Sequence, residues 1–228
     1  MSVVLEGPGR LKSTQKHRLG AVSSPLGEDV LLLRRMQASD HLGQLFTYRL
    51  ELLSEDGAIE LDEVLGGNMT VRMEALESGV ETRYFNGYVS HIRYAGFHGR
   101  HAVYQATLRP WLWFLTRNLD CRIFQNKTVP DIITTIFRDK GFSDFENRLS
   151  GEYRPREYCV QYRESDFNFI SRLMEQEGIY YYFKHENGFH KVVLADGYGS
   201  HDTVPGYQDI PYYPPDPNRL PHTRQLKR

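Results

Sequence analysis

Two histidines, His98 and His101, have the spacing of a candidate metal pair. They lie where a glycine-flanked turn is expected to lead into a strand, so the two imidazoles need not point the same way. No acidic or cysteine ligand lies at a spacing that zinc sites use. We therefore interpret both as solvent-exposed turn histidines and predict no metal site.

Three carboxylates, Asp166, Glu175 and Glu177, are candidates for acid–base chemistry. The helix expected here spreads them along its length, so capping and surface charge explain them better. The two glutamates lie at the negative end of the helix dipole, which disfavours them. Arg172 can pair with Glu175 three residues on. Glu177 has no local partner, and we expect an arginine from another element or another chain.

The possible nucleophiles and the one phosphate-loop candidate are also better explained as structure. Ser165 and Ser171 lack the nucleophile elbow of a hydrolase and any placed histidine. Cys159 with a remote histidine could act as a thiol nucleophile. Because it lies in the middle of an expected strand, we interpret it as a small buried apolar residue. Gly197-x-Gly199 follows a strand, yet the third glycine and the helix of a phosphate loop are missing. The sequence therefore predicts no catalytic, cofactor-binding or metal-binding residue, and no enzyme.

A strand, a helix and a hairpin over residues 153–194 are expected to position most of these side chains. Residues 158–162 have the aromatic and β-branched composition of a strand. Ser165 can cap the following helix and Gly178 can end it. The apolar stripe between them consists of Phe167, Phe169, Ile170, Leu173 and Met174. Residues 179–183 form an apolar strand, and Asn187-Gly188 predicts a type I′ turn into a return strand at 191–194.

The Tyr180-Tyr181-Tyr182 run has two interpretations. As core, one face packs inside and the other buries rings whose hydroxyls are hydrogen-bonded. As interface, the outward rings contact another protomer. We favour the core, because strands flank the run. Trp111 and Trp113 follow Pro110 and are expected on one strand face, also in the core.

The first half of the chain is predicted to be a series of short antiparallel strands, which favours a small barrel or sandwich. One of these strands places Phe46, Tyr48, Leu50 and Leu52 on a single face. The expected strands cover residues 30–33, 45–53, 69–76, 81–94 and 101–108, with one helical turn at 61–65 ended by Gly66-Gly67 and turns at Ser78-Gly79 and 96–99. Asn86-Gly87 lies inside a long strand, and predicts a bulge or bend that suits barrel closure.

A second helix is predicted from Thr128 to Gly141. Thr128 and Asp131 fit a capping box, and Gly141 is the stop. The apolar stripe consists of Val129, Ile132, Ile133, Ile136 and Phe137. Because the pattern changes from strands to mixed helix and strand near Leu119, we place a domain boundary there.

The composition is that of an ordinary soluble globular protein, with 40% hydrophobic and 25% charged residues among 228. The net charge of −1 does not favour nucleic acid binding. Two cysteines, Cys121 and Cys159, make no disulfide framework, and we interpret them as free buried thiols in a reduced compartment. No membrane helix and no secretory signal are recognisable, so we expect folding in the cytoplasm.

Residues 158–183 begin YCVQYRESDF, end EGIYYYF and resemble the signature of the VgrG family, the spike proteins of type VI secretion systems. Three further segments resemble motifs of this family in its order and spacing. They are FNGYV at 85–89, LRPWLW at 108–113 and RIFQNKTVPDII at 122–133. The resemblance therefore extends over most of the chain.

The resemblance implies a fold similar to a contractile-phage baseplate hub, in which two related β-barrels carry mixed α/β parts. We expect a mainly β protein, with an antiparallel β-barrel followed by a small mixed α/β subdomain. The expected division is a flexible arm at 1–20, the barrel at 21–118, the α+β subdomain at 119–196, and an extended proline-rich segment at 197–228 that begins an incomplete second barrel. The family's later barrel and needle are expected to lie outside this sequence.

The resemblance also implies a homotrimer that docks on the hexameric type VI tube protein, with effectors or baseplate proteins as further partners. It implies a structural role in contractile injection, with assembly in the cytoplasm and export by the type VI system without a signal peptide. Neither nucleic acid binding nor stable membrane insertion is expected, and no cofactor. The alternative is an enzyme or a small-ligand binding module on the same β-rich scaffold, which would need a cleft with convergent polar groups.

Overall fold

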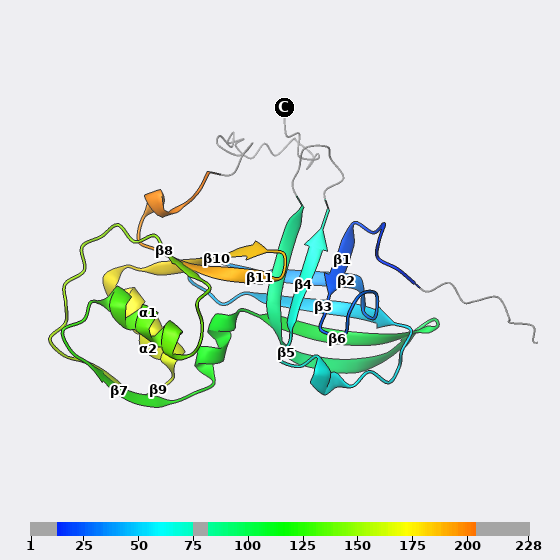
Figure 1. Cartoon of the computed structure of the whole chain (residues 1–228), viewed down its shortest axis with the longest axis horizontal. Helices are drawn as coiled ribbons and strands as arrows, with labels where there is room; N and C mark the ends of the chain where they lie inside the picture. Colours follow the sequence, from blue (N-terminus) through cyan, green and yellow to red (C-terminus); the bar gives the residue numbers. More distant parts are fainter. Residues whose placement is uncertain (1–12, 75–81, 204–228) are drawn as a thin grey trace, which may run out of the picture.

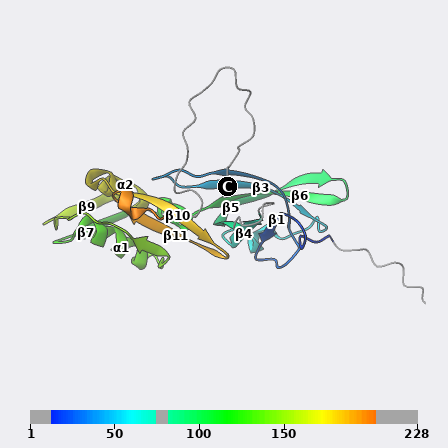
Figure 2. The ribbon, with the colours of Figure 1, turned by 90° about the horizontal axis from the view of Figure 1, so that it is seen from above.

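A computed structural model describes residues 13–74 and 82–203 of the chain. It is mainly β, with a nearly closed, barrel-like antiparallel sheet joined to a smaller part that holds both α-helices (Figure 1). Seen from above, the two parts lie side by side along the long axis of the molecule (Figure 2). The predicted fold class is confirmed. No helix in the described part is long and apolar enough to cross a bilayer.

The barrel-like sheet has six strands in the order β1-β4-β5-β6-β3-β2, and every neighbouring pair is antiparallel. The predicted alternation in β3 is confirmed, because Phe46, Tyr48, Leu50 and Leu52 are all buried. The predicted helical turn is present as η1 (Leu61–Glu63) between β3 and β4. The strands are β1 (Gly20–Ser23), β2 (Leu32–Ser39), β3 (Thr47–Ser54), β4 (Asn68–Met73), β5 (Arg83–His98) and β6 (His101–Arg109).

A single side chain, Gln15, links the two edge strands of this sheet. Its Oε1 accepts from the backbone N–H groups of Val22 and Leu33, at 2.8 and 3.1 Å. Its Nε2 donates to the carbonyl oxygens of Val22 and Leu31, both at 3.1 Å. The amide thus takes the place of a peptide group in the gap between the edges, where unpaired backbone groups would otherwise be costly. The prediction of a flexible arm over residues 1–20 is wrong for this residue, which is buried.

The bulge predicted at Asn86-Gly87 is not there. Both residues pair regularly with β4, opposite Thr70 and Met69. The register shifts of β5 lie instead between Val89 and His91 and between Tyr94 and Phe97. Space explains Gly87, because a Cβ there would lie 3.0 Å from Leu108 Cβ and 3.2 Å from Phe46 Cε2.

The second part begins with a 3₁₀ helix, η2 (Trp111–Thr116), which corrects the predicted strand. Trp111 is buried and stacks on Phe142, whereas Trp113 is only partly buried, so the two indoles do not share one face. A two-stranded ribbon and a three-stranded sheet follow, with order β7-β9 and β10-β11-β8. The elements are β7 (Asp120–Phe124), α1 (Val129–Asp139), β8 (Phe145–Asn147), β9 (Cys159–Glu164), α2 (Asp166–Glu177), β10 (Tyr180–Glu186), β11 (Phe189–Ala195) and η3 (Tyr198–Ser200).

Both α-helices have the predicted ends. Thr128 and Asp131 form a capping box at the start of α1, and Gly141 follows its end with a φ of 83°. Ser165 caps α2, and Gly178 ends it at a φ of 70°. The predicted apolar stripe of α1 is buried throughout, and that of α2 is buried except for Phe167, which is partly exposed.

The β10–β11 hairpin has the predicted two-residue turn, since Glu186 pairs with Phe189. Only Gly188 has a positive φ, of 91°. The turn is therefore not type I′, which requires positive φ at both central residues. In the Tyr180-Tyr181-Tyr182 run, only the middle ring is buried in the core. The hydroxyls of the outer two donate to the carbonyl oxygens of Gly197 and Ser200, so both rings contact the chain that follows β11.

One hydrophobic cluster continues from the barrel through both helices to β10 and β11. The domain boundary near Leu119 stays a prediction. The turn at Ser78-Gly79 and the proline-rich segment beyond residue 203 lie outside the described residues.

Replacing Gly87 by alanine should lower the free energy of unfolding by about 1–3 kcal/mol, because the added methyl group overpacks the contact with Phe46 and Leu108. Urea unfolding followed by circular dichroism measures this change. Gly197→Ala is the matched control, since a Cβ there meets nothing within 4 Å and the backbone is extended at a φ of −169°. Equal stabilities of the two variants would contradict the packing argument.

Candidate functional site

The two histidines of the candidate metal pair are direct cross-strand partners on the β5–β6 hairpin. His98 is exposed, and His101 is partly exposed with its Nε2 3.2 Å from Ser13 Oγ. Cross-strand partners project from the same face, so the structure decides the relative direction of the two imidazoles, which the sequence left open. Within residues 13–74 and 82–203, no group of three or more ligating side chains could hold a metal ion.

Among the candidate carboxylates, Asp166 is fully buried, so surface charge does not explain it. Its Oδ2 accepts from Asn118 Nδ2 at 2.6 Å and lies 3.2 Å from Lys140 Nζ. Its Oδ1 accepts from Gln161 Nε2 at 2.8 Å. With a cation and two amides bound to it, this carboxylate of α2 joins β9 to the segments that follow η2 and α1, and it is not available to a substrate.

Of the two predictions made for the glutamates at the end of α2, one is confirmed and one is wrong. Glu177 pairs with Arg156 at 2.7 Å, which confirms the expected arginine from another element. The predicted pair between Arg172 and Glu175 is wrong. Arg172 contacts β9 instead. Its guanidinium binds Glu164 at 2.7 Å and donates to the carbonyl oxygen of Val160.

The possible nucleophiles are structural in this fold. Ser165 is the cap of α2, and Ser171 lies on the same helix. Cys159 is buried, as predicted, whereas Cys121 is exposed, and both thiols are free. Gly197 and Gly199 lie at η3, a three-residue 3₁₀ helix rather than the start of an α-helix.

The sequence analysis did not single out two histidines between the barrel and the β10–β11 hairpin, of which His190 is buried and His185 is half-buried. His185 and His190 are cross-strand partners, placed symmetrically about the Asn187-Gly188 turn. This symmetry is the sequence signal that was available, because a two-residue hairpin turn fixes which residues face each other. Both rings lie against Phe46 of the barrel, with centroids 5.0 and 5.4 Å away.

His190 connects three elements through its two ring nitrogens. Its Nδ1 lies 2.7 Å from Asn86 Oδ1 on β5, and its Nε2 accepts the backbone N–H of Trp111 at 3.0 Å. Because Nε2 accepts, the proton of the neutral ring is on Nδ1 and is donated to Asn86.

His185 has the opposite tautomer. Its Nδ1 accepts the backbone N–H of Asn86 at 3.1 Å, so its Nε2 carries the proton and donates it to Tyr48 Oη at 2.9 Å. The Tyr48 hydroxyl then donates to Asp40 Oδ2 at 3.4 Å. Each imidazole therefore accepts a main-chain N–H, and protonation would place two donors face to face.

Burial lowers the pKa of both histidines. For His185 burial lowers the pKa to about 4, and nearby Arg83 lowers it further. For His190 burial and then the neighbouring His185 lower the pKa to about 3. Burial also raises the pKa of the Tyr48 hydroxyl far above its usual range. At neutral pH all three groups are uncharged.

A shallow cavity of about 280 Å³ opens beside this junction. It is lined by Asp40, Tyr48, Thr82, Arg83, Tyr84, Phe85, Phe183 and His185. A tyrosine, a histidine and an aspartate in one cavity are the convergent polar groups that an enzyme would need. His185 is not placed to act as a general base, because both of its ring nitrogens are already hydrogen-bonded and burial lowers its pKa.

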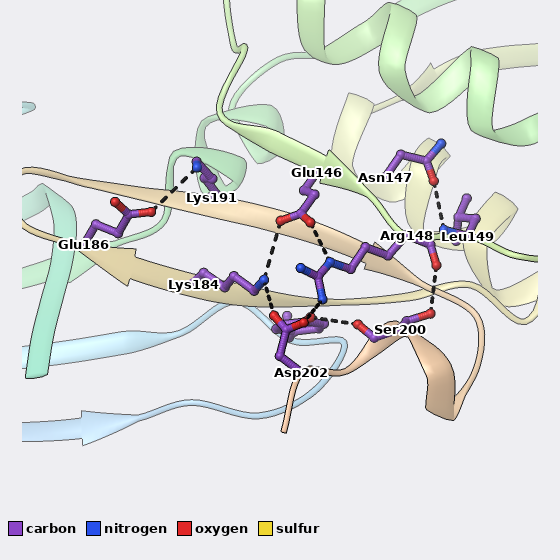
Figure 3. A network of polar contacts seen from close by, with 10 residues as sticks. Glu146, Asn147, Arg148, Leu149, Lys184, Glu186, Lys191, Ser200 and Asp202 are labelled. Carbon is purple, nitrogen blue, oxygen red and sulfur yellow. Dashed lines mark hydrogen bonds and ion pairs between the residues drawn. The ribbon is translucent and has the colours of Figure 1, made fainter. Parts of the chain in front are cut away.

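A second polar network fastens the chain after β11 to the three-stranded sheet (Figure 3). Arg148 binds Glu146 and Asp202, each at 2.5 Å, and Lys184 lies 2.7 Å from Asp202 and 3.5 Å from Glu146. The bonds from Arg148 and then Lys184 lower the pKa of Asp202 to about 2. Ser200 adds a hydrogen bond to the carbonyl oxygen of Arg148 at 2.8 Å. The chain thus leaves this sheet in a defined direction.

Comparison with known proteins gives consistent results over most of the chain. Residues 39–227 match the family described as phage tail baseplate hub (GPD). The chain is 54% identical over 202 residues to the type VI secretion system spike protein VgrG1c of Pseudomonas aeruginosa, covering 89% of this chain and 28% of that protein. It is 55% identical over 201 residues to VgrG1b of the same organism, covering 88% of this chain and 27% of that protein.

Among solved structures, the chain resembles the E. coli c3393 protein with a TM-score of 0.65 and 27% identity, covering 76% of this chain and 50% of that chain. That protein is described as a component of the type VI secretion system with structural similarity to the T4 bacteriophage tail proteins gp27 and gp5. The present chain therefore spans only a part of each relative.

Lowering the pH from 6.5 to about 5 should reduce the free energy of unfolding. Both histidines have folded-state pKa values below 6.5, so the unfolded chain takes up protons first and stability is lost as the pH falls below 6.5. Each histidine contributes a slope of up to about 1.4 kcal/mol per pH unit in this range. Carboxylates with lowered pKa values, such as Glu146 and Asp202, add their effect only at lower pH. Urea unfolding at stepped pH measures the slope.

The single variants His185→Gln and His190→Gln separate this effect from general acid sensitivity. Each should be less stable than the wild type at pH 7, yet have a shallower slope, because one of the two titrating groups is gone. The double variant should be shallower still. Wild-type slopes in both single variants would show that other groups cause the acid sensitivity.

Proposed function

The chain belongs to the phage tail baseplate hub (GPD) family, and from this membership we propose that it is the hub-like part of a type VI secretion spike. The observation that carries the proposal is the 54% identity to VgrG1c, a spike protein, over 89% of this chain. The barrel-like sheet shared with the c3393 protein supports it at the level of fold. In this proposal the chain forms a homotrimer, docks on the hexameric tube protein and is injected with the spike.

The proposed role is mechanical. A hub that transmits a push needs parts that keep their relative orientation. Three features support such rigidity: the Gln15 amide between the sheet edges, the two histidines between barrel and hairpin, and the ion pairs around Arg148. The histidines and Arg148 join segments far apart in the sequence, whereas Gln15 joins its own loop to the two strands that follow it.

We propose that this region has no enzymatic activity of its own. The neutral, fully hydrogen-bonded His185 and the buried, paired Asp166 support this part of the proposal. Assembly in the cytoplasm and export by the type VI system without a signal peptide belong to the same proposal.

Two measurements on the purified chain test the function. Light scattering over a concentration series should give a mass that approaches three times 26.6 kDa. Cosedimentation with hexameric rings of the tube protein should show binding, with the matching region of VgrG1c as the positive control. A folded chain that stays monomeric and does not bind the rings would contradict the proposal.

A further inference from the structure

The outer face of the barrel carries a set of arginines in cross-strand rows over β2, β3, β6 and β5. One row is Gln37, Arg49, Thr107 and His91, and the next is Arg35, Glu51, Gln105 and Arg93. Arg109 lies two residues beyond Thr107 on the same face of β6, in the next row, where it donates to Thr47. We call Arg35, Arg49, Arg93 and Arg109, with His91 among them, the basic face. Most of these side chains line an open groove of about 330 Å³.

The positive charge of the basic face is largely unneutralised. Among the described residues, none of its four arginines has a carboxylate within 4 Å, since Glu51 pairs with Arg34 at 2.6 Å. Arg93 and Arg109 bind only neutral groups, Gln105 and Thr47. Burial and then the like charge of Arg49 lower the pKa of Arg109. Like charges held together on a sheet face are unfavourable unless something neutralises them.

The same barrel has an excess of negative charge at another place. The loop from β3 to η1 carries five exposed carboxylates within nine residues, none with a cationic partner within 4 Å in the described part of the chain. They are Glu55, Asp56, Glu60, Asp62 and Glu63, which we call the acidic segment. Its backbone is held in place, because Tyr104 Oη donates to the carbonyl oxygen of Asp56 at 3.1 Å.

We propose that the basic face binds the acidic segment of a second copy of this chain. Both surfaces are exposed, opposite in charge and placed on one rigid barrel. The net charge of the whole chain is only −1, so copies do not repel one another strongly. Because the two surfaces differ, the contact is head-to-tail, and such contacts close into rings when the rotation permits. This inference rests on the proposed function, in which the contact between the basic face and the acidic segment joins the protomers of the trimer.

Other anionic occupants fit less well. The ten residues that line the groove include no phenylalanine, tyrosine or tryptophan, whereas single-stranded nucleic acid is generally held by base stacking on such rings as well as by charge. A small anion would lack a buried polar donor, because Arg35, Arg49, His91 and Arg93 are all exposed. A protein surface with several exposed carboxylates matches the charge of the basic face.

Charge reversals on each surface test the contact. Arg49→Glu with Arg93→Glu reverses the basic face, and Glu60→Arg with Asp62→Arg reverses the acidic segment. Light scattering at about 50 mM and about 500 mM salt should show that the wild type self-associates, more weakly at high salt. Each double variant alone should associate at least about tenfold more weakly than the wild type, because like charges then face each other. Arg154→Glu, an exposed charge reversal outside both surfaces, should leave association unchanged.

Mixing the two double variants gives the sharpest result. One keeps only its native acidic segment and the other only its native basic face, so the mixture should associate more strongly than either variant alone. The two reversed surfaces are also opposite in charge, so unlike chains should alternate in the species that form. The variant with all four reversals should regain association. Circular dichroism confirms folding, and Arg49→Gln with Arg93→Gln replaces the first variant if reversal disturbs the barrel.

Three results would overturn the inference. They are a wild type that stays monomeric at both salt concentrations, double variants that associate like the wild type, and a mixture that associates no more strongly than either variant alone. The second would leave a trimeric hub intact and place its contacts elsewhere. Binding to tube rings by a monomeric wild type would overturn the self-contact alone, so failure of this inference and failure of the proposed function are distinguishable.

Discussion

The arrangement of the two parts of this protein depends on the buried amide of Asn86. Its Oδ1 meets the Nδ1–H of His190, and its Nδ2 donates to Asn68 Oδ1 and Thr70 Oγ1 at 2.7 and 2.8 Å. Its backbone N–H is bound by His185. Such a buried network has few alternative arrangements, because any shift of the hairpin leaves polar groups unpaired in the core. Asn86 therefore sets the position of the β10–β11 hairpin along the barrel.

The hairpin extends this constraint into the rest of the second part. Its strand β11 pairs in parallel with β8, and β10 leads directly from α2. Trp111, held by His190, stacks on Phe142 and meets Phe137 of α1 edge-on. Hydrogen bonds at the junction thus determine the register, and the aromatic and aliphatic packing around it supplies most of the burial. The dependence on neutral imidazoles makes the same junction sensitive to acid.

Polar side chains both close the barrel-like sheet and hold the segment that follows β11. Gln15 satisfies the backbone groups of two sheet edges that do not pair with each other. Arg148, Lys184 and Asp202 hold the segment after β11 against the three-stranded sheet. In both places polar side chains join backbone segments that do not pair as strands. A body joined in this way suits the transmission of force better than loosely tethered domains would.

The sequence by itself determined the local structure. Alternation in β3, the capping box at Thr128, the Ser165 cap and the glycines after both helices follow from contacts within a few residues, and all are present. The VgrG-like motifs were equally readable, because they are continuous in the chain. The free thiol of Cys159 and the need of Glu177 for a distant arginine also followed from local composition.

Only the tertiary structure decided what depends on distant neighbours. Asn86-Gly87 looks like a bend in the sequence, but Asn86 serves a buried histidine 104 residues away and Gly87 makes room for Phe46. Arg172 prefers Glu164 to the nearer Glu175, and Asp166 is buried with Lys140. Gln15, in a stretch without periodicity, closes the barrel-like sheet. Periodicity and capping report which face of an element is buried, but not which polar group on another element meets it there.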